Sequence, residues 1–457
     1  MAKKAVNVPT PAIAPVANTG EVGGPSGIRV RMYRVGFGDF FLLSLREGEH
    51  VEHILIDCGV HAKPTNSIGD AIEQLKLDTG GKIALIVMTH RHADHISGFA
   101  SGADTFRQFT VGKVWMPWFE NRADPKAMRF QANLEAVATR LQLSFAARAD
   151  KSDEQFLNMA QNVTGDLSPT GISSNQIALD TLHSGFAGGA TTIQYLTAGD
   201  VPELPPELVA IGLGAQILGP PSDPALISQM DGKAHQYLSE IDAAIEADST
   251  DAPVPIFDDS LYGDASSYDP AVLGTGGSAR IEKAIAAAQP DVVRAIAAQA
   301  DNTVNNQSVV VLFAFNGKKL LFAGDAQWGN WQNFLFGGAL GSPGHTKMTP
   351  EAIGILKSID FYKVGHHGST NATPIDALEA MREGIVAMCS TAVGAYGRVA
   401  NKSEVPRIPL MDALDKKTAG KLARSDQVPV PGGAVVGGPL NPVFSTPTGA
   451  LFIDYQL

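Results

Sequence analysis

Three histidines and an aspartate stand within six residues, directly after an apolar run. In the stretch IVMTHRHADHISG these residues are His90, His92, Asp94 and His95. A hydrophobic core has no use for them, because burying unpaired imidazole and carboxylate groups is costly. On an extended segment, side chains two residues apart point the same way, so His90 and His92 can bind one ion. If a helix starts near Ala93, Asp94 and His95 face a neighbouring point, and the spacing predicts two adjacent metal sites.

The ligand types predict which metals such sites hold. Imidazole and carboxylate groups are typical zinc ligands, and a mixed nitrogen and oxygen centre also suits manganese or iron. We therefore expect zinc as the cofactor, with two ions per chain and with manganese or iron as alternatives. The competing interpretation is a solvated loop that is rich in histidine and binds no metal.

Two further polar groups stand at the ends of apolar runs. Asp325 follows the run in LLFAGDAQ, and His366 and His367 follow the run in FYKVGHHGST. In α/β sheets, functional side chains gather at the carboxyl ends of the strands. We therefore expect these groups to converge with the histidine cluster at one edge of a sheet.

The elements that must position these residues alternate between strands and helices, which predicts a layered α/β fold. Residues 70–78 and 124–162 have helical spacing of their apolar positions. Asn316-Gly317 between two apolar runs predicts a two-residue hairpin. The segments that predict strands are 28–45, 53–59, 82–90, 111–119, 191–199, 214–221, 308–325, 360–368, 384–392 and 449–457.

Residues 222–305 depart from this alternation and are interpreted as an insertion. The segment begins and ends with helical patterns, at 233–247 and 278–300, the second of them interrupted at Pro290. Its middle, 248–277, is rich in turn-forming residues and has few periodic apolar positions. Long loops without structure of their own are usually functional or disordered, so we expect a lid that governs substrate access. A surface loop or an oligomer contact is the alternative.

In their order along the chain, these motifs resemble those of the metallo-β-lactamase-fold hydrolases. The chain is most similar to the branch that contains the hydrolase domain of bacterial competence DNA-uptake channels (ComEC-like). The shared segments are VGFGDFFLL, ILIDCG, THRHADHISG, FAGD and VGHHGS, spread over most of residues 28–395. The resemblance implies an αββα sandwich with metals at one edge between two sheets, and metal-dependent hydrolysis.

The resemblance also implies a role for each ligand candidate. His90 and His92 become ligands of the first metal, and Asp94 and His95 become ligands of the second. Asp325 is implied to bridge the two ions.

The last ligand falls at His366 or His367. We prefer His366, because VGH at 364–366 repeats the strand-exit spacing of MTH at 88–90. His367 then supports the ligands or faces the substrate, and Asp94 and His367 are the expected catalytic residues. Asp57 resembles the family's structural aspartate, which orients the ligand loop by hydrogen bonds.

The chain departs from the family pattern at the first metal. Many members place a third histidine between the first cluster and the bridging aspartate, and here only His183 and His235 lie in that interval. Both are interpreted as surface histidines, and the segment 217–221, ILGPP, offers no ligand. The first metal therefore keeps open water positions or binds more weakly.

Composition limits the substrate classes. The formal net charge is −12, which argues against unspecific nucleic-acid binding, because that binding depends on Lys and Arg neutralising phosphates. The acidic balance favours a small ester, amide or lactone, whereas the ComEC-like resemblance favours a phosphodiester. The alternative to a hydrolase is a non-catalytic metal-binding regulatory module of the same fold.

Length and termini predict the organisation and the compartment. We expect a disordered leader at 1–27 and one hydrolase domain over 28–457. Residues 1–27 contain no continuous apolar segment of the kind that is typical of a secretion signal. The two cysteines cannot build a disulfide framework, and no apolar run is long enough to span a bilayer. A cytoplasmic protein without a membrane partner is expected, and the oligomeric state is left open.

Overall fold

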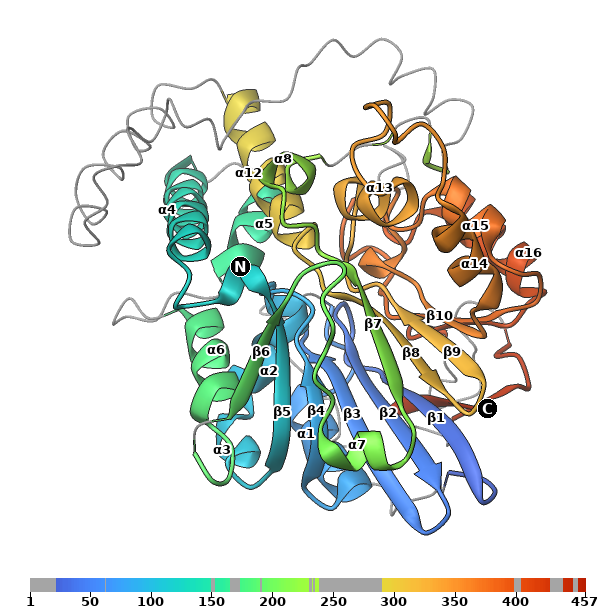
Figure 1. Ribbon diagram of the computed structural model, residues 1–457. Helices are drawn as coiled ribbons and strands as arrows, with labels where there is room; N and C mark the ends of the chain where they lie inside the picture. The colour runs from blue at the N-terminus through green and yellow to red at the C-terminus, as the bar shows by residue number, and fades with distance from the viewer. Residues whose placement is uncertain are drawn as a thin grey trace, which may run out of the picture.

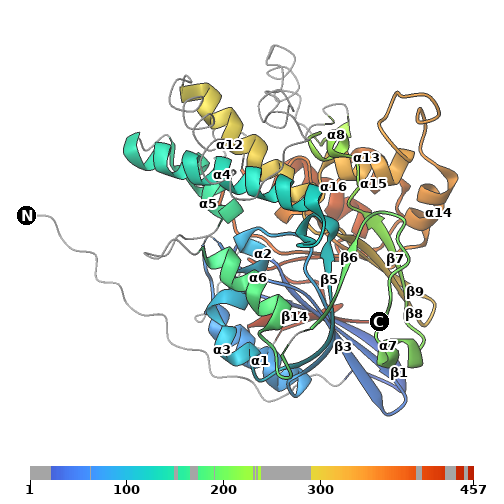
Figure 2. The same cartoon turned by 60° about the vertical axis from the view of Figure 1, so that its left-hand side comes forward.

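The computed structural model shows a mixed α/β fold with two mixed β-sheets and helices around them (Figures 1 and 2). Most of the expected leader falls outside the described residues, although the first strand begins at Ser26, inside it. No helix in the described part of the chain is long and apolar enough to cross a membrane. The structure describes residues 22–61, 63–148, 153–164, 173–189, 191–229, 232, 235–237, 290–397, 404–427, 439–446 and 451–457.

The first sheet has eight strands, in the order β13-β14-β1-β2-β3-β4-β5-β6. Neighbouring strands from β3 to β6 are parallel, whereas β13, β14, β1, β2 and β3 pair antiparallel. The strands are β1 (Ser26–Tyr33), β2 (Phe40–Glu47), β3 (His50–Cys58), β4 (Lys82–Val87), β5 (Thr110–Pro117), β6 (Thr192–Leu196), β13 (Phe444–Ser445) and β14 (Phe452–Gln456).

The second sheet has six strands, in the order β12-β11-β10-β9-β8-β7. Strands β9 to β12 are parallel neighbours, and β7, β8 and β9 pair antiparallel. The predicted hairpin joins β8 to β9 at Asn316 and Gly317, whose φ angles of 49° and 72° suit a two-residue turn. The strands are β7 (Gly214–Gly219), β8 (Val310–Phe315), β9 (Lys318–Phe322), β10 (Phe361–Lys363), β11 (Val386–Cys389) and β12 (Leu422–Arg424).

The two sheets pack face to face over a shared apolar core. Side chains from alternating strand positions of both sheets form one cluster, in which Trp115 of β5 stacks on Phe313 of β8 with ring centroids 6.3 Å apart. Phe41 of β2 meets Phe322 of β9 edge-on at 6.2 Å. Because one face of each sheet is used in this way, each opposite face needs its own apolar cover.

Helices provide that cover on both outer faces. Helices α1, α2 and α6 pack on the eight-stranded sheet, and α13 to α16 pack on the six-stranded sheet. A separate apolar cluster joins α4, α5 and α12, which lie together beyond one end of the sheets (Figures 1 and 2). The helices are α1 (Ile68–Thr79), α2 (Ala93–Ser101), α3 (Ala103–Phe106), α4 (Pro125–Arg148), α5 (Glu154–Thr164), α6 (Ser174–Ser184), α7 (Pro206–Ala210), α8 (Pro224–Ile227), α12 (Pro290–Asn305), α13 (Trp328–Phe336), α14 (Pro350–Ser358), α15 (Ile375–Ala380) and α16 (Ile408–Thr418), with short 3₁₀ turns η1 (Trp118–Glu120) and η5 (His366–Gly368).

The expected insertion is described only at its two ends. Helix α8 lies at its start, and the described part of α12 starts at Pro290. The predicted lid, 248–277, lies outside the described residues, and so does most of the helix expected at 233–247.

Candidate metal centre

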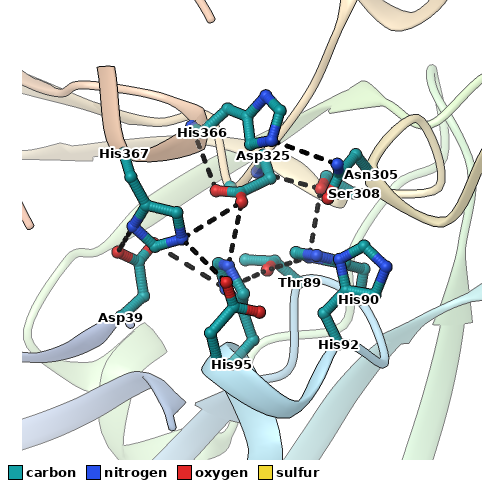
Figure 3. A network of polar contacts seen from close by, with 12 residues as sticks. Asp39, Thr89, His90, His92, His95, Asn305, Ser308, Asp325, His366 and His367 are labelled. Carbon is teal, nitrogen blue, oxygen red and sulfur yellow. Dashed lines mark hydrogen bonds and ion pairs between the residues drawn. The ribbon is translucent and has the colours of Figure 1, made fainter. Parts of the chain in front are cut away.

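The predicted polar groups meet where strands of both sheets end (Figure 3). The first cluster follows β4, and helix α2 starts at Ala93, as its spacing predicted. Asp325 follows β9, and the His366–His367 pair follows β10. Because β9 and β10 are parallel neighbours, their carboxyl ends share one edge, and this edge faces the end of β4.

Among the described residues, four buried side chains form the largest of three groups of possible metal ligands. The group that shares His95 with it consists of Asp39, Asp57 and His95. One ligand atom each from Asp94, His95, Asp325 and His367 lies within 4.8 Å of the others. The Nε2 atoms of His95 and His367 lie 3.1 Å and 3.3 Å from Asp325 Oδ2. His367 Nε2 is also 3.2 Å from Asp94 Oδ2. The structure thus brings Asp94, His95 and Asp325 together as expected and adds His367.

His90, His92 and Asp94 form a second group that overlaps the first. Their ligand atoms also lie within 4.8 Å of one another, and all three side chains are buried. The two imidazole rings lie 4.8 Å apart at an angle of 71°. In these groups the shared carboxylate is Asp94, and the bridging role of Asp325 stays a prediction.

The donor atoms of this cluster fit divalent metal ions. Nε2 of His90, His92 and His95, together with Asp94 Oδ1, are buried without a hydrogen-bond partner among the described residues. Buried polar atoms are nearly always hydrogen-bonded, so several unpartnered ones in a single cluster need an explanation. Two ligand atoms bound about 2.1 Å from one tetrahedral ion lie about 3.4 Å apart, whereas charge-assisted hydrogen bonds span about 2.8 Å. The contacts of His367 at 3.2 and 3.3 Å are closer to the ligand spacing, and that of His95 at 3.1 Å lies midway.

Asp57, at the end of β3, holds the ligand loop. Its Oδ1 accepts a hydrogen bond from the Thr89 backbone N–H, and its Oδ2 accepts one from the Thr89 hydroxyl, both at 2.7 Å. His95 Nδ1 donates to Asp57 Oδ2, also at 2.7 Å, which leaves His95 Nε2 directed at Asp325. These are the orienting hydrogen bonds that the resemblance implied for Asp57.

The other imidazoles are oriented in the same way. His367 Nδ1 donates to the Ser390 carbonyl at 2.9 Å, which leaves the lone pair of a neutral His367 on Nε2, facing Asp94 and Asp325. His90 Nδ1 lies 3.1 Å from the Thr89 hydroxyl and 3.3 Å from the Ser308 hydroxyl. In each case Nδ1 has a protein partner and Nε2 is available to a metal.

The structure reverses the preference for His366 over His367. Consecutive left-handed conformations, with φ of 42° at His366 and 51° at His367, turn the two rings in different directions. Such conformations are uncommon for residues other than glycine and tend to be retained at functional sites. His367 enters the ligand group, whereas His366 contributes its backbone N–H to Asp325 Oδ1 at 3.0 Å.

The ring of His366 is held by polar side chains instead of carboxylates. Its Nδ1 lies 2.6 Å from Ser369 Oγ and 3.0 Å from Asn371 Oδ1. Its Nε2 lies 3.2 Å from Asn305 Nδ2, which comes from α12. The strand-exit spacing could not predict which of the two histidines faces the ligand group, because it does not determine the backbone conformation after the strand.

Lys363 is a member of the centre that the sequence analysis missed. Its ammonium group forms a close ion pair with Asp39 and lies 3.5 Å from Asp325 Oδ1. Burial alone would lower the pKa of Lys363, but the two carboxylates outweigh it and raise the pKa. A lysine inside an apolar strand next to a His-His pair was the available signal.

The loop that carries Asp39 touches the ligand loop directly. The Asp39 backbone N–H donates to the Asp94 carbonyl at 2.8 Å. A Cβ at Gly38, which has a φ of 155°, would lie 2.4 Å from the Gly59 carbonyl oxygen and 2.7 Å from that of Asp94. Glycine is therefore required here, and the predicted strand run 28–45 divides into β1 and β2 around this loop.

Arg91, inside the histidine motif, anchors the ligand loop from the other side. Its guanidinium binds Glu120 with a two-pronged contact at 2.7–2.8 Å and Glu135 of α4 at 2.5 Å. The pKa of Arg91 would be lowered by burial, but these two carboxylates raise it. The arginine is thus a structural member of the motif, and the histidines on either side turn the opposite way.

Burial keeps His90 and His92 neutral. It lowers the pKa of His90 well below its ordinary value, and the neighbouring His95 and His92 lower it further. Burial also lowers the pKa of His92 to about 3. Both imidazoles are therefore in the form that binds a metal at neutral pH.

Carboxylates have the opposite effect on His95 and His367. Burial alone would lower the pKa of His95, but Asp325, Asp57 and Asp39 raise it well above its ordinary value. Burial alone would also lower the pKa of His367, but the carboxylates, mainly Asp325 and Asp94, raise it to about 10. Without metal these two rings carry protons that balance the carboxylates, so metal binding must release protons.

A cavity of about 240 Å³ lies beside the centre. His92, Asp94 and Asp325 form part of its wall. Helix α12 adds Asp301 and Asn305, which the sequence analysis did not single out. A small molecule inside this cavity would therefore contact the ligand groups.

The two other histidines considered for the first metal lie elsewhere. His183 is half-buried on α6, with Nδ1 2.7 Å from the Leu179 carbonyl and Nε2 3.2 Å from the Tyr195 hydroxyl. His235 stacks on Trp328 at 4.3 Å and forms a close contact with Asp376. Neither belongs to a group of possible metal ligands among the described residues.

Two comparisons with known proteins found no match. No protein-family model matches this chain, and no curated protein matches it at a significant level. The resemblance to metallo-β-lactamase-fold hydrolases therefore stays a prediction, and the function has to be inferred from the chemistry of the centre.

Proposed function

We propose that this protein is a metal-dependent hydrolase with a dinuclear centre, zinc being the first candidate and manganese or iron the alternatives. The observation that carries the proposal is the meeting of His90, His92, Asp94, His95, Asp325 and His367 beside a cavity, with several of their ligand atoms unpartnered. We further propose that the two packed sheets and their outer helices are a metallo-β-lactamase-type αββα sandwich, because the ligand groups lie at strand ends of both sheets.

The proposed ligands divide into two sets. His90, His92 and Asp94 would hold the first ion, and Asp94, His95, Asp325 and His367 would hold the second. When bound, the ions would supply Lewis-acid chemistry, polarising a carbonyl or phosphoryl oxygen and making water nucleophilic at neutral pH.

The chain's own residues preorganise this chemistry. Asp57 and the Ser390 carbonyl hold Nδ1 of His95 and His367, so the two Nε2 atoms stay aimed at Asp325. Lys363 neutralises part of the buried carboxylate charge, which allows Asp39 and Asp325 to stay ionised. Ligands fixed in this way need no reorganisation during the reaction.

The cavity favours a small neutral substrate over a nucleic-acid strand. Among the described residues of its wall there is no lysine or arginine, the residues that usually bind phosphates. Asn162, Asn305 and Ser369 offer hydrogen bonds, and Phe37 and Tyr396 offer apolar surface. A volume of about 240 Å³ fits the reacting part of a small ester, amide or lactone better than a polymer.

A substrate panel with controlled metal content tests the proposal. The purified protein is stripped with a chelator, reloaded with zinc or manganese, and assayed on generic ester, lactone, lactam and phosphodiester substrates. We expect close to two ions per chain and turnover of one class, lost on stripping and restored on reloading.

A matched pair of variants distinguishes the loss of the metal centre from general damage to the fold. His90→Gln should lose metal and turnover, whereas His183→Gln, the same change at a histidine outside the ligand groups, should keep both. Full metal loading without turnover of any class would overturn the hydrolase proposal and favour a non-catalytic metal-binding module.

A further inference from the structure

The first ion has only two ligands that it does not share with the second ion. His90 and His92 supply two nitrogens, and Asp94, the third member of the group, also belongs to the second group. Zinc and similar ions require at least four donors in total. The two histidines that lie between this cluster and Asp325 in the sequence, His183 and His235, are engaged elsewhere.

Helix α12 brings a carboxylate to this position. Asp301 Oδ1 lies 3.4 Å from His92 Nε2, the nitrogen that has no hydrogen-bond partner. The Asp301 side chain is 12% exposed and borders the cavity. Ala297, Ala300 and Val304, on the same helix, are buried in the apolar cluster with α4 and α5, so the helix is held in place by packing.

The distance suits two ligands of one ion. Two atoms bound at about 2.1 Å in a tetrahedral arrangement lie about 3.4 Å apart. A direct charge-assisted hydrogen bond between imidazole and carboxylate would be about 2.8 Å long, as between His95 Nδ1 and Asp57 at 2.7 Å. Asp301 and His92 therefore stand at ligand spacing. Asp301 nevertheless lies outside the group formed by His90, His92 and Asp94 and would have to move closer to them to share their ion.

The charge on Asp301 also calls for a cation. Within the described residues, no lysine or arginine forms an ion pair with Asp301, whereas Asp39 in the same cluster has Lys363. A buried carboxylate in this position is stabilised most directly by a metal ion.

A second oxygen lies one helical turn further along α12. Asn305 follows Asp301 by four residues, so both side chains share one face of the helix. Asn305 is 1% exposed, lines the same cavity, and its Oδ1 has no hydrogen-bond partner. Amide oxygens also bind the harder divalent metals.

We propose that Asp301 is a ligand of the first metal ion, completing the His90–His92 site with a carboxylate delivered by α12. This inference rests on the proposed metal centre but not on hydrolysis. It assigns a metal-binding role to a segment that the sequence analysis connected only with substrate access. Two imidazoles with carboxylate oxygens make a mixed donor set that accepts zinc and also suits manganese or iron.

Metal titration of Asp301 variants tests this assignment. Asp301→Ala should retain one tightly bound ion and bind the other at least about 100-fold more weakly, since changes even to residues behind a ligand cost 10- to 100-fold. Asp301→Glu should recover part of the affinity, because it keeps a carboxylate. Asn302→Ala, a change to the neighbouring residue on the same cavity wall, should bind two ions like the wild type.

Two measurements distinguish a metal-ligand role of Asp301 from a purely structural role. Competition with a chelator gives the affinity of each site, and the visible absorption of the cobalt-loaded protein reports its coordination. Asp301→Asn, which keeps the side-chain shape, serves if Asp301→Ala does not fold. Loss of one cobalt signal with unchanged thermal unfolding of the metal-free protein is the expected result.

The outcomes also distinguish this inference from the hydrolase proposal. Wild-type affinity for two ions in Asp301→Ala and Asp301→Asn would overturn the ligand assignment, even if the protein hydrolyses a substrate. Weakened binding in these variants, without turnover by the wild type, would uphold the assignment and overturn the hydrolase. A wild-type chain that binds no metal would overturn both.

Discussion

The eight-stranded sheet carries two clusters of buried charge that are balanced in different ways. One surrounds Arg31 in the middle of β1, and the other is the candidate metal centre at the end of β4. Both contain aspartates with almost no solvent contact. They differ in whether the protein itself supplies the charge that those aspartates need.

Around Arg31 every charge has a protein partner. Its guanidinium binds Asp454 through two hydrogen bonds of 2.7 Å and binds Asp78 at 2.5 Å. Asp78 also accepts hydrogen bonds from the Tyr33 hydroxyl at 2.7 Å and from Gln74 Nε2 at 2.9 Å. Such a network is fully satisfied, and it ties β1 to α1 and β14.

At the centre the carboxylates outnumber the fixed cations. One lysine, Lys363, stands among five buried aspartates. The histidines that face them leave Nε2 atoms without hydrogen-bond partners. The aspartates are Asp39, Asp57, Asp94, Asp301 and Asp325.

The difference shows how a structural charge cluster can be distinguished from a metal-binding site. Where a fixed arginine balances the carboxylates, removing it should damage the fold. Where the balance is left to an exchangeable ion, removing a ligand should damage binding and leave the fold largely intact. Burial alone does not distinguish the two clusters, whereas unpartnered ligand atoms do.

The largest effect is expected at Asp325. Asp325→Ala removes the carboxylate that His95 and His367 face, so metal binding at the second site should fall at least about 100-fold and any turnover should be lost. Circular dichroism should show a folded protein. Elemental analysis after dialysis gives the metal content, and Asp376→Ala, a carboxylate outside the ligand groups, is the control. Normal metal content in Asp325→Ala would contradict the view that a metal ion balances the carboxylates of this centre.

The next largest effect is expected at Arg31. Arg31→Met leaves Asp78 and Asp454 buried without their cation, which should lower the free energy of unfolding by about 3–5 kcal/mol. Denaturant unfolding of the metal-free protein measures this loss. The folded fraction should still bind metal like the wild type. A loss below about 1 kcal/mol would show that the network is not a structural requirement.

Metal removal should have a smaller effect on stability. An ion that is present at 100 times its dissociation constant stabilises the folded state by about 2.7 kcal/mol. Chelation should therefore lower the melting temperature of the wild type and of Arg31→Met by similar amounts. Asp325→Ala should respond much less. Equal shifts in all three proteins would mean that the ion binds elsewhere.

The smallest effect concerns pH and His53, which lies near the Arg31 cluster. Burial, helped by Arg29, lowers the pKa of His53 to about 4. Because an unfolded histidine binds its proton near pH 6.5, stability should decrease as the pH falls from about 6.5 to about 4. His53→Gln should lack this part of the pH dependence.

The measurement is the difference in unfolding free energy between the wild type and His53→Gln at pH 7 and pH 4. We expect the wild type to lose at most about 3 kcal/mol relative to the variant on acidification. Contributions from the metal centre cancel in this difference, because both proteins share it. A constant difference would show that His53 titrates normally.

Local pattern was enough to predict much of the centre. His90, His92, Asp94 and His95 could be selected because a strand pattern ends immediately before them, and the structure places them at the end of β4. Asp325 was selected by the same reasoning after β9. The carboxyl ends of parallel neighbours such as β9 and β10 share an edge of one sheet. Strand β4 belongs to the other sheet, so its meeting with them depends on how the two sheets pack.

The choice between His366 and His367 could not be made in this way. Both follow the same strand, and only the two left-handed residues that end it decide which ring reaches Asp94. Asp301 gave even less indication, because it lies on a helix of the expected insertion and does not follow an apolar strand pattern. Its approach to His92 depends on how α12 packs against α4 and α5.

The sequence by itself determined the layered α/β class, the hairpin at Asn316-Gly317 and the identity of most ligand candidates, because apolar periodicity and turn preferences act over a few neighbouring residues. The tertiary structure alone decided that Lys363 pairs with Asp39 and that Asp301 faces His92. These contacts join segments far apart in the chain. They exist only because two sheets and a helical cluster pack in one particular arrangement, which no local pattern encodes.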